Sequence, residues 1–128
     1  MSLMAYTPYI IETIIREYVS DHTDLIQYAR NEILKIGEEK FINRCIQYRC
    51  CPTNIDTKSV YTIQRIFSLF SRDKVLAFRF YLSGKRNYEL NNLCKQKGIR
   101  ITCYANHRKN AMINRLIERL EEIMFYNI

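Results

Sequence analysis

The sequence lacks tryptophan and is poor in glycine and proline, with three and two among its 128 residues. Three scattered glycines cannot form a Gly-rich phosphate-binding loop, and the scarcity of both residue types predicts few turns and no flexible linker. No apolar run approaches the roughly 18–20 residues that cross a bilayer. Glu12, Arg16 and Glu17 interrupt the apolar N-terminal segment, so no secretory signal is expected. These absences predict an intracellular protein, nuclear or cytoplasmic, without a membrane partner.

Cysteine occurs five times, an odd number, and no two cysteines have the CxxC spacing of paired metal ligands. In a chain without a secretory signal, these residues are expected to be reduced thiols. Cys103 and His107 are separated by three residues, as zinc ligands can be, but no second pair with regular spacing accompanies them. The sequence therefore predicts neither a metal site nor a cofactor.

The sequence also gives little support for catalysis. Cys50 or Cys51 could serve as a nucleophile with a distant histidine, yet no local pattern places a base beside either thiol. The adjacent carboxylates at 38–39 and at 121–122 would point about 100° apart on a helix, which suits a solvated face better than acid–base chemistry. We expect a protein without enzymatic activity.

Apolar residues recur with helical periodicity through most of the chain. The pattern predicts an all-α fold, a compact single-domain bundle of about six or seven helices over residues 1–128. Within it, a helical body at 1–84 precedes a basic segment at 85–128 that forms a helix–extended loop–helix. The helices are expected near residues 7–18, 24–36, 38–48, 57–70, 75–82, 88–97 and 108–125.

Individual residues set the expected helix ends. Gly37 is a left-handed cap for the helix that precedes it, and Asp56 or Thr57 is expected to cap the helix that follows the loop at 51–56. The run from 75 to 82 fits a strand or a helix by composition, and its helical neighbours favour a helix. The apolar residues expected on the inner face of the last helix are Met112, Ile113, Leu116, Leu120 and Ile123.

The net charge of +7 is concentrated in the last third of the chain. Residues 1–84 contain 11 Lys and Arg against 9 Asp and Glu, whereas residues 85–128 contain 9 against 4. A phosphate backbone, an acidic protein or an anionic membrane would be attracted to such a segment. The charge alone is also compatible with a basic protein that has no anionic partner.

Between Glu89 and Leu120, a short helix ends at a glycine followed by isoleucine, and a longer helix begins beside basic residues. The matching positions are Leu90, Leu93, Gly98 and Ile99 in the first part and Lys109, Met112, Ile113, Arg115 and Leu116 in the second. This pattern resembles the SAP motif, a small helix–extended loop–helix module that binds DNA. The loop is longer here than in the family. The glycine that the family has in this loop, just before the second helix, is absent. Asn106 is expected to adopt the left-handed conformation in place of that glycine.

The resemblance implies that the loop and the N-terminus of the last helix contact DNA phosphates, often in AT-rich duplex. Backbone N–H groups and the positive end of the helix dipole support such contacts, which give affinity but little sequence readout. Tyr104 is the best candidate for stacking on a base, and Tyr88 is a weaker one. The candidate residues are Lys85, Arg86, Lys95, Lys97, Arg100, Tyr104, His107, Arg108 and Lys109.

The sequence therefore favours a nucleic-acid-binding protein, with double-stranded DNA as the expected partner. The alternative is an all-α protein–protein interaction module, such as a viral or regulatory adaptor that binds its partner through an apolar groove. Frequent Ile, Tyr, Asn and Lys are typical of AT-rich genomes, including those of some large DNA viruses. Pairing of the last helix with a second copy of the chain would give a homo-oligomer.

Overall fold

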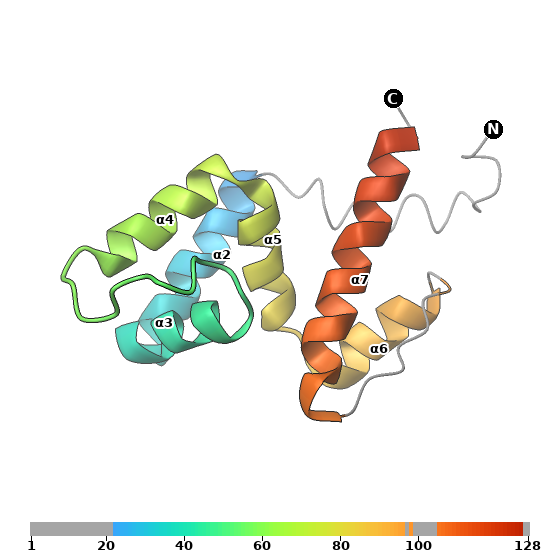
Figure 1. Cartoon of the computed structure of the whole chain (residues 1–128), viewed down its shortest axis with the longest axis horizontal. Helices are drawn as coiled ribbons and strands as arrows, with labels where there is room; N and C mark the ends of the chain where they lie inside the picture. The colour runs from blue at the N-terminus through green and yellow to red at the C-terminus, as the bar shows by residue number, and fades with distance from the viewer. Residues whose placement is uncertain (1–21, 97, 99–104, 127–128) are drawn as a thin grey trace. The chain divides into compact units, whose positions relative to one another are not determined.

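The computed structural model describes residues 22–96, 98 and 105–126 (Figure 1). These residues form helices and no strand, so the prediction of an all-α fold is confirmed for the described part of the chain. The helix expected near residues 7–18 lies outside it. The helices are α2 (His22–Ile36), α3 (Glu38–Gln47), α4 (Thr62–Arg72), α5 (Lys74–Ser83), α6 (Asn87–Gln96) and α7 (Ala105–Tyr126).

The chain divides into two compact units between Gly84 and Lys85. The unit Asp21–Gly84 contains α2, α3, α4 and α5, which contact one another. The other unit contains α6 and α7, which also pack together. No helix in the described residues is long and apolar enough to cross a membrane.

Gly37 separates α2 from α3, as the sequence predicts. Its φ of 89° lies in the left-handed region that glycine adopts without steric cost. Its N–H group donates to the Ile33 carbonyl at 2.9 Å, which closes the last turn of α2. Glu38 and Glu39 then occupy the first turn of α3, where the helix dipole favours negative charge.

The start predicted for α4 is wrong, because the helix begins at Thr62 rather than after Asp56 or Thr57. The Asp56 carboxylate accepts the Lys58 N–H at 2.9 Å, and the Ser59 hydroxyl accepts the Tyr61 N–H at 3.1 Å. These side chains stabilise turns in the loop, a role that competes with helix capping for the same residue types. Val60 consequently lies outside the helix, with 85% of its surface exposed.

Aromatic side chains from α3, α4 and α5 form the centre of the first unit. Phe41, Phe70 and Phe80 are completely buried. The ring of Phe41 lies 4.9 Å from that of Phe80, and the rings of Phe70 and Phe80 are 5.6 Å apart. Such tilted arrangements are favourable beyond the burial of apolar area. The core therefore holds α3, α4 and α5 together through the edges and faces of three rings.

The run at 75–82 is helical, as predicted, and its position explains why its sequence is ambiguous. Within α5 the buried residues follow one another closely, at positions 77, 78, 80, 82 and 83. A helix that is buried on most of its surface needs no polar face, so the usual helical periodicity is lost. Asp73 marks its start, because its carboxylate accepts the Val75 N–H at 3.0 Å.

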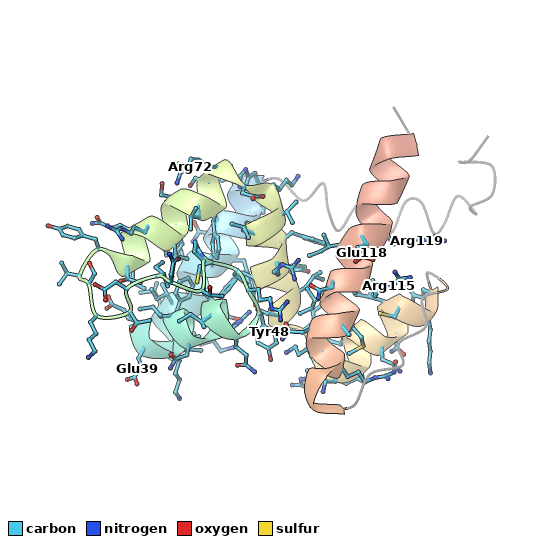
Figure 2. All side chains as sticks on the ribbon, in the orientation of Figure 1. Glu39, Tyr48, Arg72, Arg115, Glu118 and Arg119 are labelled. Atoms are coloured by element: carbon cyan, nitrogen blue, oxygen red, sulfur yellow. The ribbon has the colours of Figure 1, made fainter. Side chains whose placement is uncertain are left out.

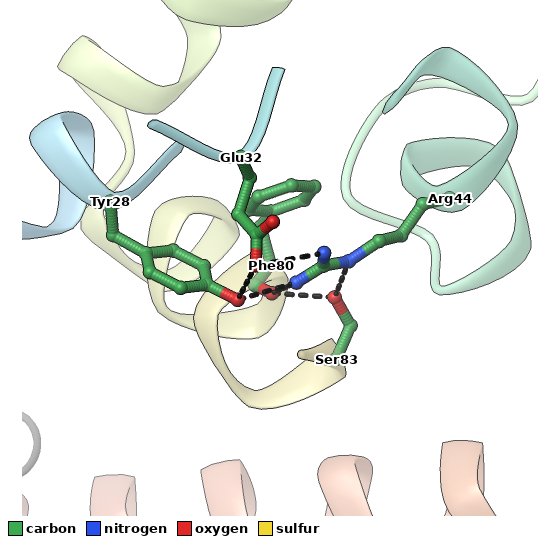
Figure 3. Close-up of polar contacts among 5 residues, drawn as sticks. All are labelled: Tyr28, Glu32, Arg44, Phe80 and Ser83. Atoms are coloured by element: carbon green, nitrogen blue, oxygen red, sulfur yellow. Dashed lines mark hydrogen bonds and ion pairs between the residues drawn. The ribbon is translucent and has the colours of Figure 1, made fainter. Parts of the chain in front are cut away.

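A cluster of polar contacts around Arg44 joins α2, α3 and α5 (Figure 3). The Arg44 guanidinium donates to the Ser83 hydroxyl at 2.8 Å, to the Tyr28 hydroxyl at 2.8 Å and to the Phe80 carbonyl at 3.1 Å. One of its nitrogens lies 3.5 Å from a Glu32 carboxylate oxygen. The guanidinium also stacks over the Phe80 ring, 4.1 Å from its centroid. We refer to Tyr28, Glu32, Arg44, Phe80 and Ser83 as the Arg44 cluster.

Gly84 follows α5 directly and is constrained by the Arg44 cluster. A Cβ atom at this position would collide with the Tyr28 hydroxyl and with a guanidinium nitrogen of Arg44. The Tyr28 hydroxyl donates to Glu32 and accepts from Arg44, so it cannot move without breaking those hydrogen bonds. Glycine is therefore required at position 84 by packing rather than by backbone conformation.

We predict that Gly84→Ala lowers the free energy of unfolding by about 1–3 kcal/mol, the usual range for an overpacked site. Chemical denaturation followed by far-UV circular dichroism measures this change. In a Tyr28→Phe background, which removes the closest colliding atom, the same substitution should cost less. Equal costs in the two backgrounds would show that the collision is not the cause.

Candidate nucleic-acid interface

The basic pair Lys85 and Arg86 stands directly before α6. The Arg86 carbonyl accepts the Leu90 N–H at 3.1 Å, the first hydrogen bond of the helix. The Glu89 carboxylate accepts the Arg86 N–H at 3.2 Å, which satisfies a donor left free by helix geometry. Glu89 is the only Asp or Glu between residues 85 and 109, and it is used for this cap.

The other end of α6 agrees with the sequence pattern. The helix ends at Gln96, and Gly98 has a φ of 69° with its N–H donated to the Lys95 carbonyl at 3.2 Å. This is a glycine cap in the left-handed conformation. The predicted helix end at Gly98 is confirmed, whereas the extended segment predicted at 99–104 lies outside the described residues.

The last helix, α7, begins at Ala105, three residues earlier than predicted. Asn106 consequently lies within the helix, and its predicted left-handed conformation is wrong. The predicted start was based on the cations at 108 and 109. Ala105 can begin the helix earlier because alanine has the highest helix propensity. The earlier start places position 107 in the first turn and Arg108 at its end.

The two helices pack through apolar side chains. The buried residues are Leu90, Leu93 and Cys94 on α6 and Met112, Ile113, Leu116 and Ile117 on α7. The predicted inward positions of Met112, Ile113 and Leu116 are confirmed. The side chains of Leu120 and Ile123 lie outside the described part. This apolar contact fixes α6 against the first half of α7.

A polar contact also connects the helices beside the apolar one. The Arg108 guanidinium on α7 donates to the Asn91 side-chain carbonyl on α6 at 3.0 Å. Tyr88 and Lys95 lie three and four residues from Asn91, so the three side chains share one face of α6. Lys95 is exposed, and Tyr88 exposes 61% of its surface. The structure thus brings two predicted cations, Lys95 and Arg108, to the same side of α6.

The structure describes the side chains of five of the nine candidate residues. Arg86 and Lys95 are exposed, while Lys85, Arg108 and Lys109 are half-buried. The side chains of Lys97, Arg100, Tyr104 and His107 lie outside the described residues. Asn91 was not predicted, because no sequence signal distinguishes an asparagine that orients a distant arginine from one that faces solvent.

The charges of α7 run against its dipole. Its first turn has no acidic residue and its last turn no basic residue, although helices favour the opposite arrangement. Arg108 and Lys109 therefore add to the positive potential at the N-terminal end. Further along, Arg115 pairs with Glu118, three residues on, at 2.9 Å on the exposed surface (Figure 2). The N-terminal end of α7 is the part of this unit best suited to an anion.

The cysteines of the first unit are buried thiols. Cys45 and Cys50 have no exposed surface and Cys51 has 7%, and the Cys50 N–H donates to the Cys45 carbonyl at 2.7 Å. Burial raises the pKa of Cys50 to about 12 and also raises the pKa values of Cys45 and Cys51. Thiols with raised pKa values are weak nucleophiles at neutral pH. In the described part of the chain, no three or more His, Cys, Asp or Glu residues are placed to hold a metal.

Comparison with protein-family models, with curated proteins and with solved structures gave no match to this chain. The resemblance to the SAP motif stays a prediction from the sequence.

Arg108 has a structural role in addition to any role in binding. We predict that Arg108→Ala lowers the stability of the α6–α7 pair by at least about 1 kcal/mol, because the hydrogen bond to Asn91 is lost. Amide hydrogen exchange in residues 90–94 and 112–117 measures the change. Lys95→Ala, at an exposed position, is the control and should shift stability by no more than about 0.5 kcal/mol. Unchanged protection in Arg108→Ala would contradict the assignment.

Cys50 should react slowly in the folded protein. With a pKa of about 12, roughly one thiol in ten thousand is ionised at pH 8. Iodoacetamide labelling at pH 8, read by peptide mass spectrometry, should be at least a hundredfold slower than in denaturant. Since unfolding releases this proton once the pH exceeds the ordinary thiol pKa of 9.0, stability should also fall above that pH. Similar labelling rates in both states would contradict the burial of Cys50.

Proposed function

We propose that this chain is a non-enzymatic DNA-binding protein, and that its basic segment at 85–109 holds duplex DNA through phosphate contacts. One observation carries the proposal: this segment contains seven Lys and Arg but a single carboxylate, Glu89, and that carboxylate caps α6. The segment therefore has an excess of six positive charges, seven cations less one carboxylate. Cationic side chains of such a segment bind nucleic acid chiefly through its backbone phosphates.

The placement of the cations supports this assignment. Lys95 and Arg108 share one side of α6, and Arg108 is oriented by Asn91. An arginine whose position is fixed before binding loses less conformational entropy when it contacts a phosphate. The N-terminal end of α7 contributes its own N–H groups and the positive end of its dipole.

The unfavourable charge arrangement in α7 has a natural explanation in this proposal. Cations near the N-terminal end of a helix interact unfavourably with its dipole, by about 0.3–1 kcal/mol. A phosphate bound beside Arg108 and Lys109 would remove this cost. DNA binding should therefore stabilise the first turns of α7 more than the rest of the helix.

Exposed Tyr88 adds a feature that phosphate contacts do not require. It lies on the same face of α6 as Lys95, with 61% of its surface exposed. An exposed aromatic ring beside cations can stack on a base or pack against a sugar. Tyr88 therefore supports binding of nucleic acid over binding of a simple inorganic anion.

We predict salt-dependent binding of a fluorescein-labelled AT-rich duplex, measured by fluorescence anisotropy at about 50 and 200 mM salt. Arg86→Gln/Lys95→Gln should weaken binding at the lower salt about tenfold and reduce the salt slope by up to about 2, since each lost phosphate contact lowers it by about 0.9. Both positions are exposed, so the fold should be retained.

Lys35→Gln/Lys40→Gln is the matched control, since it removes the same charge from exposed positions of α2 and α3. It should change the affinity less than twofold. A second variant, Lys97→Gln/Arg100→Gln, tests one cation at the predicted end of the short helix and one in the predicted loop, and should also weaken binding. Absence of binding at low salt, or equal losses in the control and the test variant, would overturn the proposal.

A further inference from the structure

A pocket of about 400 Å³ lies in the unit Asp21–Gly84, between α4 and the loop before it. The helix contributes Arg65, Ser68, Leu69 and Arg72, and the loop contributes Pro52 and Ile55 among others. Figure 2 shows Arg72 near the end of α4. The pocket has a basic rim and an apolar wall, and no carboxylate lines it.

The two arginines of the rim are available to a ligand. Both are exposed, and neither forms an ion pair with a carboxylate in the part of the chain that the structure describes. The hydrogen bond from the Arg72 guanidinium to the Ser68 carbonyl, one turn earlier, is long at 3.4 Å. Arginine forms planar paired hydrogen bonds with carboxylates and phosphates. The rim therefore selects an anionic ligand.

The spacing of the arginines indicates more than one anionic group. Arg65, Ser68 and Arg72 are three and four residues apart and share a face of α4. Seven residues of helix separate the two arginines by about 10–11 Å along the axis. Two carboxylates four residues apart lie on the same face of an extended peptide and are separated by about 13 Å, a distance that two flexible arginine side chains can span. This match favours a peptide with two acidic side chains over one small anion.

The apolar wall accounts for the space between the arginines. Leu69 and Ile55 are half-buried, and Pro52 is exposed beside them. An apolar side chain between the two acidic ones would cover this surface and gain the free energy of burial.

The loop that forms the wall is fixed at both ends. Buried Cys50 and Cys51 precede it, and buried Thr62 follows it with its hydroxyl 2.9 Å from the Ser59 carbonyl. Between them, the Ile55 N–H donates to the Pro52 carbonyl at 3.3 Å and closes a turn. A wall held in this way needs little ordering on binding, which lowers the entropic cost.

We propose that this pocket binds an acidic peptide segment of a partner protein, with an apolar side chain seated between two carboxylates. Arg65 and Arg72 bind the carboxylates, and Leu69, Ile55 and Pro52 receive the apolar side chain. The site lies in a different unit from the basic segment, so it is an addition to DNA binding and does not depend on it.

The test is a titration of the full-length, ¹⁵N-labelled chain with a short peptide that carries Glu, Leu and Glu at alternate positions. Backbone amide shifts should change in residues 52–55 and 65–72. Arg65→Gln/Arg72→Gln should weaken binding at least tenfold, and Lys35→Gln/Lys40→Gln, which has the same net charge, less than twofold. Replacing the peptide's Leu by Ser should also weaken binding, without any change to the protein.

Three results would overturn the proposal. The first is peptide affinity that is unchanged in Arg65→Gln/Arg72→Gln. The second is inorganic phosphate producing the same shifts and displacing the peptide at equal concentration, which would make the pocket a simple anion site. The third is the AT-rich duplex shifting residues 65–72 and losing affinity in that variant, which would assign the pocket to nucleic acid. Loss of DNA binding at the basic segment alone would leave the peptide result unaffected.

Discussion

The fold of the first unit depends on how Arg44 is accommodated. A guanidinium group with a side chain only 15% exposed has lost most of its water and needs replacement partners. Hydroxyl and carbonyl oxygens of α2 and α5, together with the Glu32 carboxylate, supply them. Removal of any one partner leaves a buried polar group unsatisfied, which costs more than the hydrogen bond itself is worth. The apolar core holds the helices together, and the Arg44 cluster determines how they are aligned.

Much of this fold could be predicted from the sequence because local signals agree with tertiary packing. Gly37 ends α2 and Asp73 begins α5 for reasons present in a few neighbouring residues. The start of α4 could not be predicted in this way. Asp56 suits a turn as well as a cap, and the choice depends on the burial of Thr62, whose hydroxyl donates to the Asp56 carbonyl. The pocket over α4 was missed for the same reason, since its wall is a loop positioned by tertiary contacts.

The candidate DNA site was predicted from charge, whereas the placement of its side chains depends on a contact between α6 and α7. The positions of Lys95 and Arg108 in the sequence do not indicate that they share a side of α6. That relation depends on the hydrogen bond between Arg108 and Asn91. Glu89 looked like one more charged residue, yet its capping role explains why an otherwise basic segment retains a carboxylate. The first role joins side chains of two different helices, and the second joins a side chain to a backbone N–H group.

Gly84 and the Arg44 cluster limit how this chain can change over generations. A larger residue at 84 requires a smaller group at 28, and a change at 28 removes a hydrogen-bond partner of Arg44. Single substitutions at these positions are therefore disfavoured, and accepted changes should occur in coupled sets. The exposed faces of α2 and α3 carry no such coupling. Distant relatives of this protein would then differ widely on the surface while keeping a tyrosine, an arginine and a glycine at widely separated positions, a pattern that ordinary motif searches are poorly suited to find.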